Sequence, residues 1–298
     1  MKLEGLTTEA RNEATKNIDQ LSTIDMVTLI NQEDQKVAKA IQKVLPAIAQ
    51  AIDLAADRFK QGGRLIYCGA GTSGRLGALD AIELTPTYSV SPKRAFGLIA
   101  GGEKAMFQAV EGAEDSKELA VHDLQEQELS SNDVVIAIAA SGRTPYAIAA
   151  LEYGKTIGAL TISITCNDKS QMNILADIGI APIVGPEVIT GSTRMKAGSA
   201  QKMVLNMFST GIMIKIGNIY QNLMVNVQPT NEKLVQRATN IIKEATGLEE
   251  VSAKQYLEKA HLEVAPAIVM AKTDLDFATA KQRLAESDGQ IAKVLTES

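Results

Sequence analysis

Small and hydroxyl-bearing residues gather in this sequence directly after short apolar runs. The segment GAGTSGRLG, Gly69 to Gly77, follows one such run and holds Thr72 and Ser73 between glycines. A turn of this kind lets the backbone approach an anion, which then lies at the N-terminus of the following helix. The sequence therefore predicts that Gly71, Thr72 and Ser73 bind a phosphate group.

The same glycines fit the G-x-G-x-x-G pattern of dinucleotide-binding turns. That use needs an acidic residue about 20 residues further along the chain, and the window from 89 to 94 contains none. A tight strand-to-helix turn without a ligand is the other alternative. The two hydroxyl groups beside the glycines favour a monophosphate over both alternatives.

A second hydroxyl-rich turn, AASGRTPY from Ala139 to Tyr146, follows another apolar run. Thr144 is suited to cap a helix that has Pro145 at its first position, and a capped turn without a ligand is the plain alternative. Ligands of parallel sheets lie outside the carboxyl ends of the strands, so two such turns can meet at one anion. The residues expected to contact the same phosphate as the first turn are Ser141, Gly142, Arg143 and Thr144.

The segment TGSTRMKAGSAQK, Thr190 to Lys202, is the clearest positive patch in a net acidic chain. It contains three hydroxyl groups before Arg194, then two lysines, and no acidic residue. Its glycines favour a shaped loop over a solvated basic helix surface. Further phosphate contacts are expected from Ser192, Thr193 and Lys196.

Two glutamates are candidates for acid and base catalysis. Glu83 lies in DAIELTPT, near the end of the helix that the first turn opens, where the helix dipole does not favour a negative charge. Glu114 lies in VEGAEDS, ahead of the next helix. The plain alternatives are an exposed surface residue for Glu83 and a favourable charge at a helix start for Glu114.

Composition and charge exclude several classes of function. The chain has 298 residues, of which 45% are hydrophobic, and a formal net charge of -5. A negative balance argues against nucleic-acid binding, which needs a basic face. The two histidines, His122 and His261, are far apart in the sequence and show no companion ligands, so no metal site is expected.

The cysteines and the N-terminus indicate the compartment. Cys68 and Cys166 each end an apolar run and are expected in the core, which fits a reducing environment. The first residues are charged and form no signal peptide, and no apolar run reaches spanning length. The sequence therefore predicts a cytoplasmic protein with no membrane partner.

The candidate segments are positioned by alternating strands and helices. Five short, continuous apolar runs read as strands that are covered on both faces: Arg64 to Cys68, Phe96 to Ala100, Asp133 to Ala139, Ala159 to Cys166 and Ile178 to Val184. Helix-compatible segments lie between them: Leu76 to Leu84, Ala105 to Glu128, Thr144 to Ile157 and Met172 to Ala176. This alternation predicts an α/β fold with a doubly wound parallel five-stranded sheet.

Helical segments flank the predicted sheet domain. Residues 1–53 form an N-terminal helical segment, which includes an amphipathic stretch from Thr7 to Gln20. Residues 54–220 form the sheet domain and close with a helix from Ser199 to Tyr220. Residues 231–298 follow a break at Pro229 and are expected to form a small helical bundle.

Taken in order, these segments resemble the N-acetylmuramic acid 6-phosphate etherase family over nearly the whole chain. The segments that carry the resemblance are GAGTSGRLG, DAIELTPT, IAGG, VEGAEDS, AASGRTPY and TGSTRMKAGSAQK. The resemblance implies the sugar isomerase (SIS) fold, a phosphorylated amino sugar as ligand and a homodimer. It also implies cleavage of the lactyl ether of N-acetylmuramic acid 6-phosphate during cell-wall sugar recycling.

The resemblance also implies roles for the two glutamates. Glu83 corresponds to the proton donor to the departing lactate, and Glu114 to the carboxylate that removes the C2 proton. The sugar's own aldehyde serves as the electron sink, so no cofactor is expected. A rise of 1.5 Å per residue puts Glu83 about 12 Å behind Arg75, so we expect it to serve a site near the interface of a dimer.

Two other functions remain open on the same fold. One is a regulatory sugar-phosphate binder, similar to the glucokinase regulatory protein, which needs no acid–base pair. The other is an aldose–ketose isomerase, which needs a base but no acid aimed at C3. The presence of both Glu83 and Glu114 favours the etherase.

Overall fold

The computed structural model describes residue 8 and residues 10–296. It divides into two compact units, the first formed by Met1–Ile82 and Pro92–Ser209 and the second by Glu83–Ser91 and Thr210–Ser298. The boundaries fall within helix α4 (Gly71–Tyr88) and helix α8 (Lys196–Lys215). The segment that the sequence sets apart as residues 1–53 belongs to the first unit.

A five-stranded parallel sheet forms the centre of the first unit. Its strands are β1 (Leu65–Gly69), β2 (Ala95–Ile99), β3 (Val134–Ile138), β4 (Leu160–Ile164) and β5 (Ile178–Ile180). Every residue of β1, β3 and β4 is buried, because both faces of the sheet are covered. The predicted doubly wound sheet and its five strands are confirmed, except that β5 ends at Ile180 and not at Val184.

The strand order, β2-β1-β3-β4-β5, determines where a ligand can bind. The chain moves from β1 outward to β2, and then crosses back to place β3 on the other side of β1, with Leu65 in register with both Ala95 and Val134. A topological switch point therefore lies between the carboxyl ends of β1 and β3, where open α/β sheets bind ligands.

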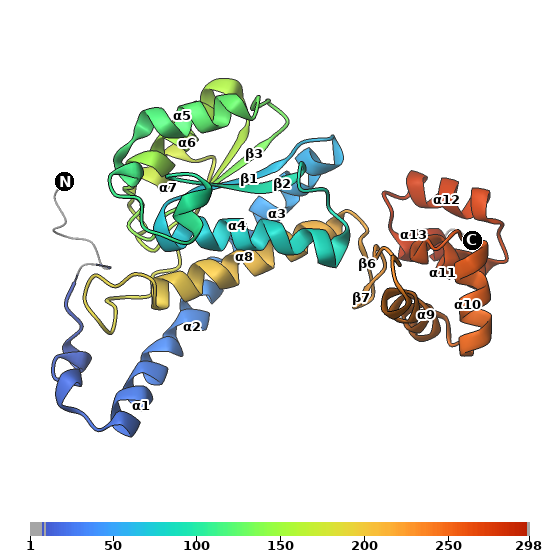
Figure 1. Ribbon diagram of the computed structural model, residues 1–298, viewed down its shortest axis with the longest axis horizontal. Coiled ribbons are helices and arrows are strands. Elements are labelled where there is room, and N and C mark those ends of the chain that lie inside the picture. Colours follow the sequence, from blue (N-terminus) through green and yellow to red (C-terminus); the bar gives the residue numbers. More distant parts are fainter. Residues whose placement is uncertain (1–7, 9, 297–298) are drawn as a thin grey trace. The chain divides into compact units, whose positions relative to one another are not determined.

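Helices cover both faces of this sheet. Besides parts of α4 and α8, the helices of the first unit are α1 (Thr23–Asp34), α2 (Lys36–Gln42), α3 (Leu45–Lys60), α5 (Lys117–Glu126), α6 (Pro145–Ile157) and α7 (Gln171–Leu175). In Figure 1, α5 and α6 lie on one side of the strands and α4 and α8 on the other, while α1 and α2 extend away from the sheet. In α1 only Glu33 is buried.

Helix α4 and the segment before α5 differ from their predictions. Helix α4 continues through Pro86 to Tyr88, although a proline disfavours helix at the residue before it. Pro86 has no N–H to donate to the carbonyl of Ile82, a residue that is 59% exposed. The helix expected over Ala105 to Glu128 begins only at Lys117, because Gly112 takes a left-handed conformation and Ser116 caps the helix by accepting from the Leu119 N–H.

Helix α8 also ends earlier than predicted. The helix stops at Lys215, and Gly217 follows with a φ of 82°, which favours glycine and terminates helices. The chain then forms a short antiparallel pair, β6 (Ile219–Tyr220) with β7 (Leu223–Met224). The prediction of helix up to Tyr220 is therefore wrong over its last turn.

The second unit contains the predicted helical bundle. Its helices are α9 (Glu232–Thr246), α10 (Glu250–Lys259), α11 (Val264–Thr273), α12 (Phe277–Glu286) and α13 (Ile291–Thr296). Ile242, Leu257 and Ile268 lie fully buried at its core. Helix α11 is apolar over most of its surface because the other helices of the bundle surround it.

At the N-terminus, the predicted amphipathic helix is replaced by two 3₁₀ turns, Glu13–Thr15 and Ile18–Gln20. Part of the predicted helix, including Thr7, lies outside the described residues. None of the helices in the described part of the chain has the length and apolarity needed to cross a membrane.

Candidate active site

A cavity of about 320 Å³ opens beside the turns that follow β1 and β3. Hydroxyl groups dominate its polar lining, and they belong to Thr72, Ser73, Ser141, Thr144 and Thr193. The lining also includes the cation Arg143 and the carboxylates Glu114 and Asp115. The structure thus brings together side chains from all three hydroxyl-rich segments and one of the two candidate glutamates.

The turn after β1 supplies backbone donors as well as hydroxyl groups. Helix α4 begins at Gly71, and its first residues, Gly71 to Ser73, line the cavity. N–H groups in the first turn of a helix have no partner within the helix, and the helix dipole adds partial positive charge there. Gly71 has a φ of 51°, a left-handed conformation that glycine adopts at little cost.

The turn after β3 brings a second helix start to the same cavity. Helix α6 begins at Pro145, as predicted, and Thr144 is at its N-cap position. The Thr144 side chain accepts no hydrogen bond from the first turn of the helix. Ser141 Oγ accepts from the Arg143 N–H at 3.2 Å and shapes the turn. Gly142 is not among the residues that line the cavity. Its φ is 66°, and a Cβ there would lie 2.3 Å from Ser170 Cβ, so the turn requires glycine at this position.

The loop before α8 contributes Thr193, whose carbonyl accepts from the Gly198 N–H at 3.0 Å. Ser192 is half-buried but is not among the lining residues. Buried Glu187 accepts from the N–H groups of Lys196 and Ala197, each at 2.9 Å. A carboxylate of the chain itself therefore occupies the N-terminus of α8.

The structure places Lys196, predicted to contact phosphate, in the interior. Its side chain is 1% exposed, and its Nζ lies 2.6 Å from Glu33 Oε2. Burial works to raise the pKa of Glu33, but hydrogen bonds from Lys196 and Lys36 outweigh burial and hold that pKa below its usual value. These contacts fit a structural role for Lys196 behind the cavity.

The two candidate glutamates have different surroundings. Glu114 lies in the 3₁₀ turn Ala113–Asp115 and lines the cavity together with Asp115. Glu83 is an exposed residue of α4 and is not among the lining residues. The pairing of Glu83 with Glu114 therefore stays a prediction.

Arg75 holds the segment between β2 and α5, which contains Glu114. The sequence analysis did not predict this role for Arg75. Its Nε donates to the carbonyl oxygens of Ala105 and Met106, each at 3.0 Å. Arg75 belongs to the first glycine-rich segment, so its position was visible, but nothing in the sequence shows which loop it contacts. Gln201 was also missed: it is buried and accepts from Ser73 Oγ at 3.0 Å.

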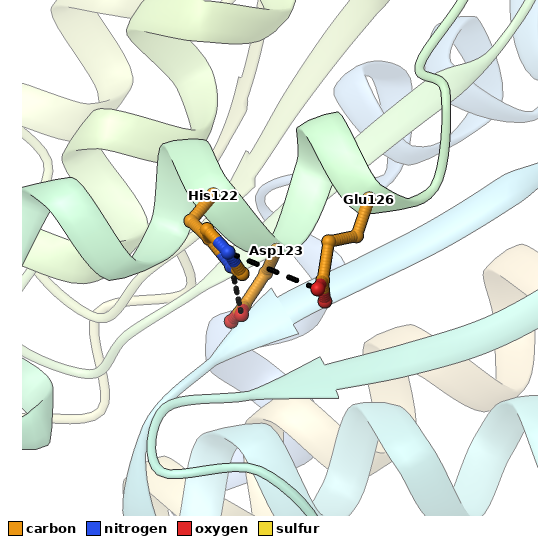
Figure 2. A group of neighbouring side chains, drawn as sticks. All are labelled: His122, Asp123 and Glu126. Carbon is orange, nitrogen blue, oxygen red and sulfur yellow. Dashed lines mark ion pairs between the residues drawn. The ribbon is translucent and has the colours of Figure 1, made fainter.

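A cluster on α5 corrects the expectation that His122 lacks companion ligands. Figure 2 shows His122, Asp123 and Glu126 close together, and their nitrogen and oxygen atoms lie within 4.8 Å of one another. The side chains of His122 and Glu126 are exposed, while Asp123 also accepts from the Tyr146 hydroxyl at 2.5 Å. None of the three lines the cavity.

The cysteines lie in the core, as expected. Both thiols are buried. Burial raises the pKa of the Cys166 thiol to about 12 and that of Cys68 further. Neither thiol is therefore ionised near neutral pH, which leaves both as small core residues.

Family matches identify the first unit, with its parallel five-stranded sheet and hydroxyl-rich turns, as an SIS domain. Residues 111–211 match the SIS domain family, and residues 47–155 match the N-terminal SIS domain of glucokinase regulatory protein. Residues 221–267 match the C-terminal lid domain of glucokinase regulatory protein.

Comparison with whole proteins identifies the family, among proteins that contain SIS domains, to which the chain belongs. The chain is 80% identical over 295 residues to N-acetylmuramic acid 6-phosphate etherase 1 of Enterococcus faecalis, covering 99% of this chain and 98% of that protein. It is 58% identical over 297 residues to the N-acetylmuramic acid 6-phosphate etherase of Lactobacillus gasseri, covering all of both chains. The chain belongs to the N-acetylmuramic acid 6-phosphate etherase family, as the resemblance of its motifs predicted.

Proposed function

We propose that this chain cleaves the D-lactyl ether of N-acetylmuramic acid 6-phosphate, giving N-acetylglucosamine 6-phosphate and D-lactate for cell-wall sugar recycling. The observation that carries the proposal is the cavity at the switch point, where hydroxyl-rich turns and Glu114 meet. The names of the relatives support the same substrate.

The phosphate of the sugar binds between the two helix starts. The N–H groups at the start of α4 and the hydroxyl groups of Thr72, Ser73, Ser141 and Thr144 supply donors for its oxygens. Arg143 and Thr193 complete the lining, and Gly71 and Gly142 shape the turns. Lys196 holds the third loop through its ion pair with Glu33, and half-buried Ser192 belongs to the same loop.

The reaction proceeds by elimination and then addition of water. Opening of the sugar ring exposes an aldehyde at C1, which acidifies the proton at C2. Glu114 removes this proton, the C3–O bond breaks, and a double bond forms between C2 and C3. Glu83 donates a proton to the lactate oxygen as it leaves. Water then adds a hydroxyl group to C3 and a proton to C2.

Glu83 acts in this scheme from a second copy of the chain. It lies one helical turn after Leu79 on α4. The apolar side chains of Leu79 and its neighbour on the helix surface, Ile82, are 40% and 59% exposed. A second subunit covering this face buries the apolar side chains and brings Glu83 toward the partner's cavity. The proposed assembly is a homodimer with its sites near the interface, acting in the cytoplasm.

Release of D-lactate tests the proposed function. Purified protein incubated with N-acetylmuramic acid 6-phosphate should release D-lactate, whereas Glu83→Ala and Glu114→Ala should abolish release and keep binding of N-acetylglucosamine 6-phosphate. Glu111→Ala is the matched control, because Glu111 is exposed beside Glu114 and does not line the cavity. Binding without lactate release would indicate a regulatory sugar-phosphate binder, an alternative raised by the match to the N-terminal domain of glucokinase regulatory protein. Formation of a ketose would indicate an isomerase.

A further inference from the structure

Gln201 is a buried polar side chain directly behind the cavity. It lies in the second turn of α8, with 1% of its surface exposed. Its Oε1 accepts from Ser73 Oγ at 3.0 Å, and Ser73 lines the cavity. Within the described part of the chain, no group bonds its buried Nε2 atom.

This orientation of the Gln201 amide is unfavourable because it leaves the buried Nε2 atom without an acceptor. A buried N–H group without a partner loses its bonds to water and gains nothing in return. A buried carbonyl oxygen without a partner is the more common of the two situations in proteins. If the amide turns over, Nε2 takes the place of Oε1 and donates to Ser73 Oγ, which can accept because a hydroxyl oxygen has two lone pairs.

The direction of this bond decides what Ser73 can do for an anion. A serine hydroxyl has one hydrogen, and a bond from Ser73 to Gln201 Oε1 uses it. A phosphate ester offers mainly acceptors, so Ser73 binds phosphate only when its hydrogen points into the cavity. A bond from Gln201 Nε2 to Ser73 Oγ leaves that hydrogen available.

We propose that Gln201 is a positioning residue that donates from Nε2 to Ser73 Oγ and thereby directs the Ser73 hydrogen at the phosphate ester in the cavity. The inference rests on the proposed function, because it assumes that the anion held beside Ser73 is a sugar phosphate. It gives a binding role to a residue of α8 that touches neither the sugar nor its phosphate.

A double-mutant cycle tests the proposal, with N-acetylglucosamine 6-phosphate as the probe and calorimetry as the measurement. Gln201→Met keeps the length of the side chain and removes both polar atoms. It should weaken binding about three- to tenfold in the otherwise unchanged protein. In the Ser73→Ala background it should have no further effect. In turnover, KM should rise while kcat changes little, because the phosphate is remote from C2 and C3.

The sign of the change separates the two directions of the bond. If Gln201 only accepts from Ser73, Gln201→Met frees the serine hydrogen and tightens binding or leaves it unchanged, which would overturn the proposal. Equal weakening in both backgrounds would also overturn it, because Gln201 would then act without Ser73. Gln201→Leu gives the same comparison if the methionine variant does not fold.

Two controls complete the design. Ser209→Ala removes a different buried hydrogen bond of α8, from Ser209 Oγ to Asp80 at 3.2 Å, and should lower stability without changing affinity for the probe. Unphosphorylated N-acetylglucosamine tests the premise. If wild-type protein does not prefer the phosphorylated sugar, the proposed function fails together with the inference; if it does and only the cycle fails, the function stands alone.

Discussion

The ion pair between Lys196 and Glu33 holds the loop before α8 from the interior of the first unit. The two side chains are 1% and 4% exposed. Removing one member of a buried pair costs up to about 3–5 kcal/mol, and here Glu33 keeps only its exposed partner Lys36. Lys196→Met should therefore lower the free energy of unfolding by about that amount, as measured by urea denaturation.

Lys36→Met is the matched control for this prediction. Lys36 bonds the other oxygen of the same carboxylate, at 2.5 Å, but its side chain is 57% exposed. Exposed ion pairs contribute less than about 1 kcal/mol. Similar losses of stability in the two lysine variants would contradict the distinction between a buried and an exposed partner.

Asp80 makes the stability of the first unit depend on pH. Its carboxylate accepts from the Tyr67 hydroxyl at 3.0 Å and from Ser209, and burial raises its pKa to about 6 from an ordinary 3.8. Because the folded pKa is the higher one, the stabilisation is present below pH 3.8 and is lost as the pH rises through 6. The loss amounts to about 3 kcal/mol at most.

Asp80→Asn should remove this dependence. Relative to wild type, the variant should gain stability in urea denaturation as the pH rises from 5 to 8. Asp133→Asn provides the opposite sign at lower pH, because hydrogen bonds from Arg64 and Ser130 outweigh burial and hold the pKa of Asp133 below its usual value. Relative to wild type, it should lose stability as the pH rises toward about 5 and change little between about pH 5 and 8. If both variants shift in the same direction with pH, the assignment to Asp80 fails.

The roles of these residues depend on partners that are distant in the sequence. The segment containing Lys196 predicts a positive patch, but the partner Glu33 lies 163 positions away in α1. Local spacing therefore could not distinguish a buried structural cation from a phosphate ligand. Thr72, Ser73, Ser141 and Thr144 were predicted correctly as neighbours of one cavity, because each follows a strand end at the switch point.

At the scale of elements, Glu187 stabilises the start of α8 and thereby the loop that brings Thr193 to the cavity. Its carboxylate accepts from two N–H groups at the start of α8, the helix that follows Thr193. An amide has one oxygen in place of two, so Glu187→Gln should lose one of these bonds and destabilise the protein by about 1–2 kcal/mol. The loosened Thr193 loop should also raise KM in the lactate assay with little change in kcat.

The capping bond of α9 gives the control for this prediction. Asn231 accepts from the Leu234 N–H at 3.0 Å in the second unit. Asn231→Ala should reduce stability by about 1 kcal/mol and leave KM unchanged. A rise of KM in this variant as well would show that KM follows general stability and not the Thr193 loop.

The sequence predicts elements well where burial is uniform and poorly where one contact decides the boundary. The runs that became β1, β3 and β4 are apolar throughout because helices cover both faces of the sheet, so they identify their strands almost to the residue. The segment before α5 reads as helix locally, yet Gly112 and the contacts of Arg75 hold it as a loop. Such contacts between distant residues leave no trace in periodicity.

At the scale of the whole molecule, the proposed homodimer with shared sites predicts complementation between inactive chains. Glu83→Gln and Glu114→Gln should each lose D-lactate release when prepared alone. After unfolding and joint refolding, half of the dimers combine the two variants, and one of their two sites has both wild-type glutamates. The mixture should therefore recover about a quarter of wild-type activity.

The same mixture distinguishes action within one chain from action between chains. If Glu83 serves the cavity of its own chain, every site in the mixture lacks one glutamate and no activity returns. Wild-type protein carried through the same unfolding and refolding controls for recovery of the fold. Activity in either variant before mixing would instead contradict the assigned roles of the glutamates.

The central position of β1 has a consequence during synthesis of the chain. Arg64 and Asp133, which close the pairing of β1 with β3, are 69 positions apart. A ribosome that has released β1 and β2 thus leaves one apolar strand edge uncovered until β3 emerges, and nascent edges of this kind invite aggregation. We expect truncated chains that end before residue 134 to be retained by chaperones, while chains that extend past β5 are released.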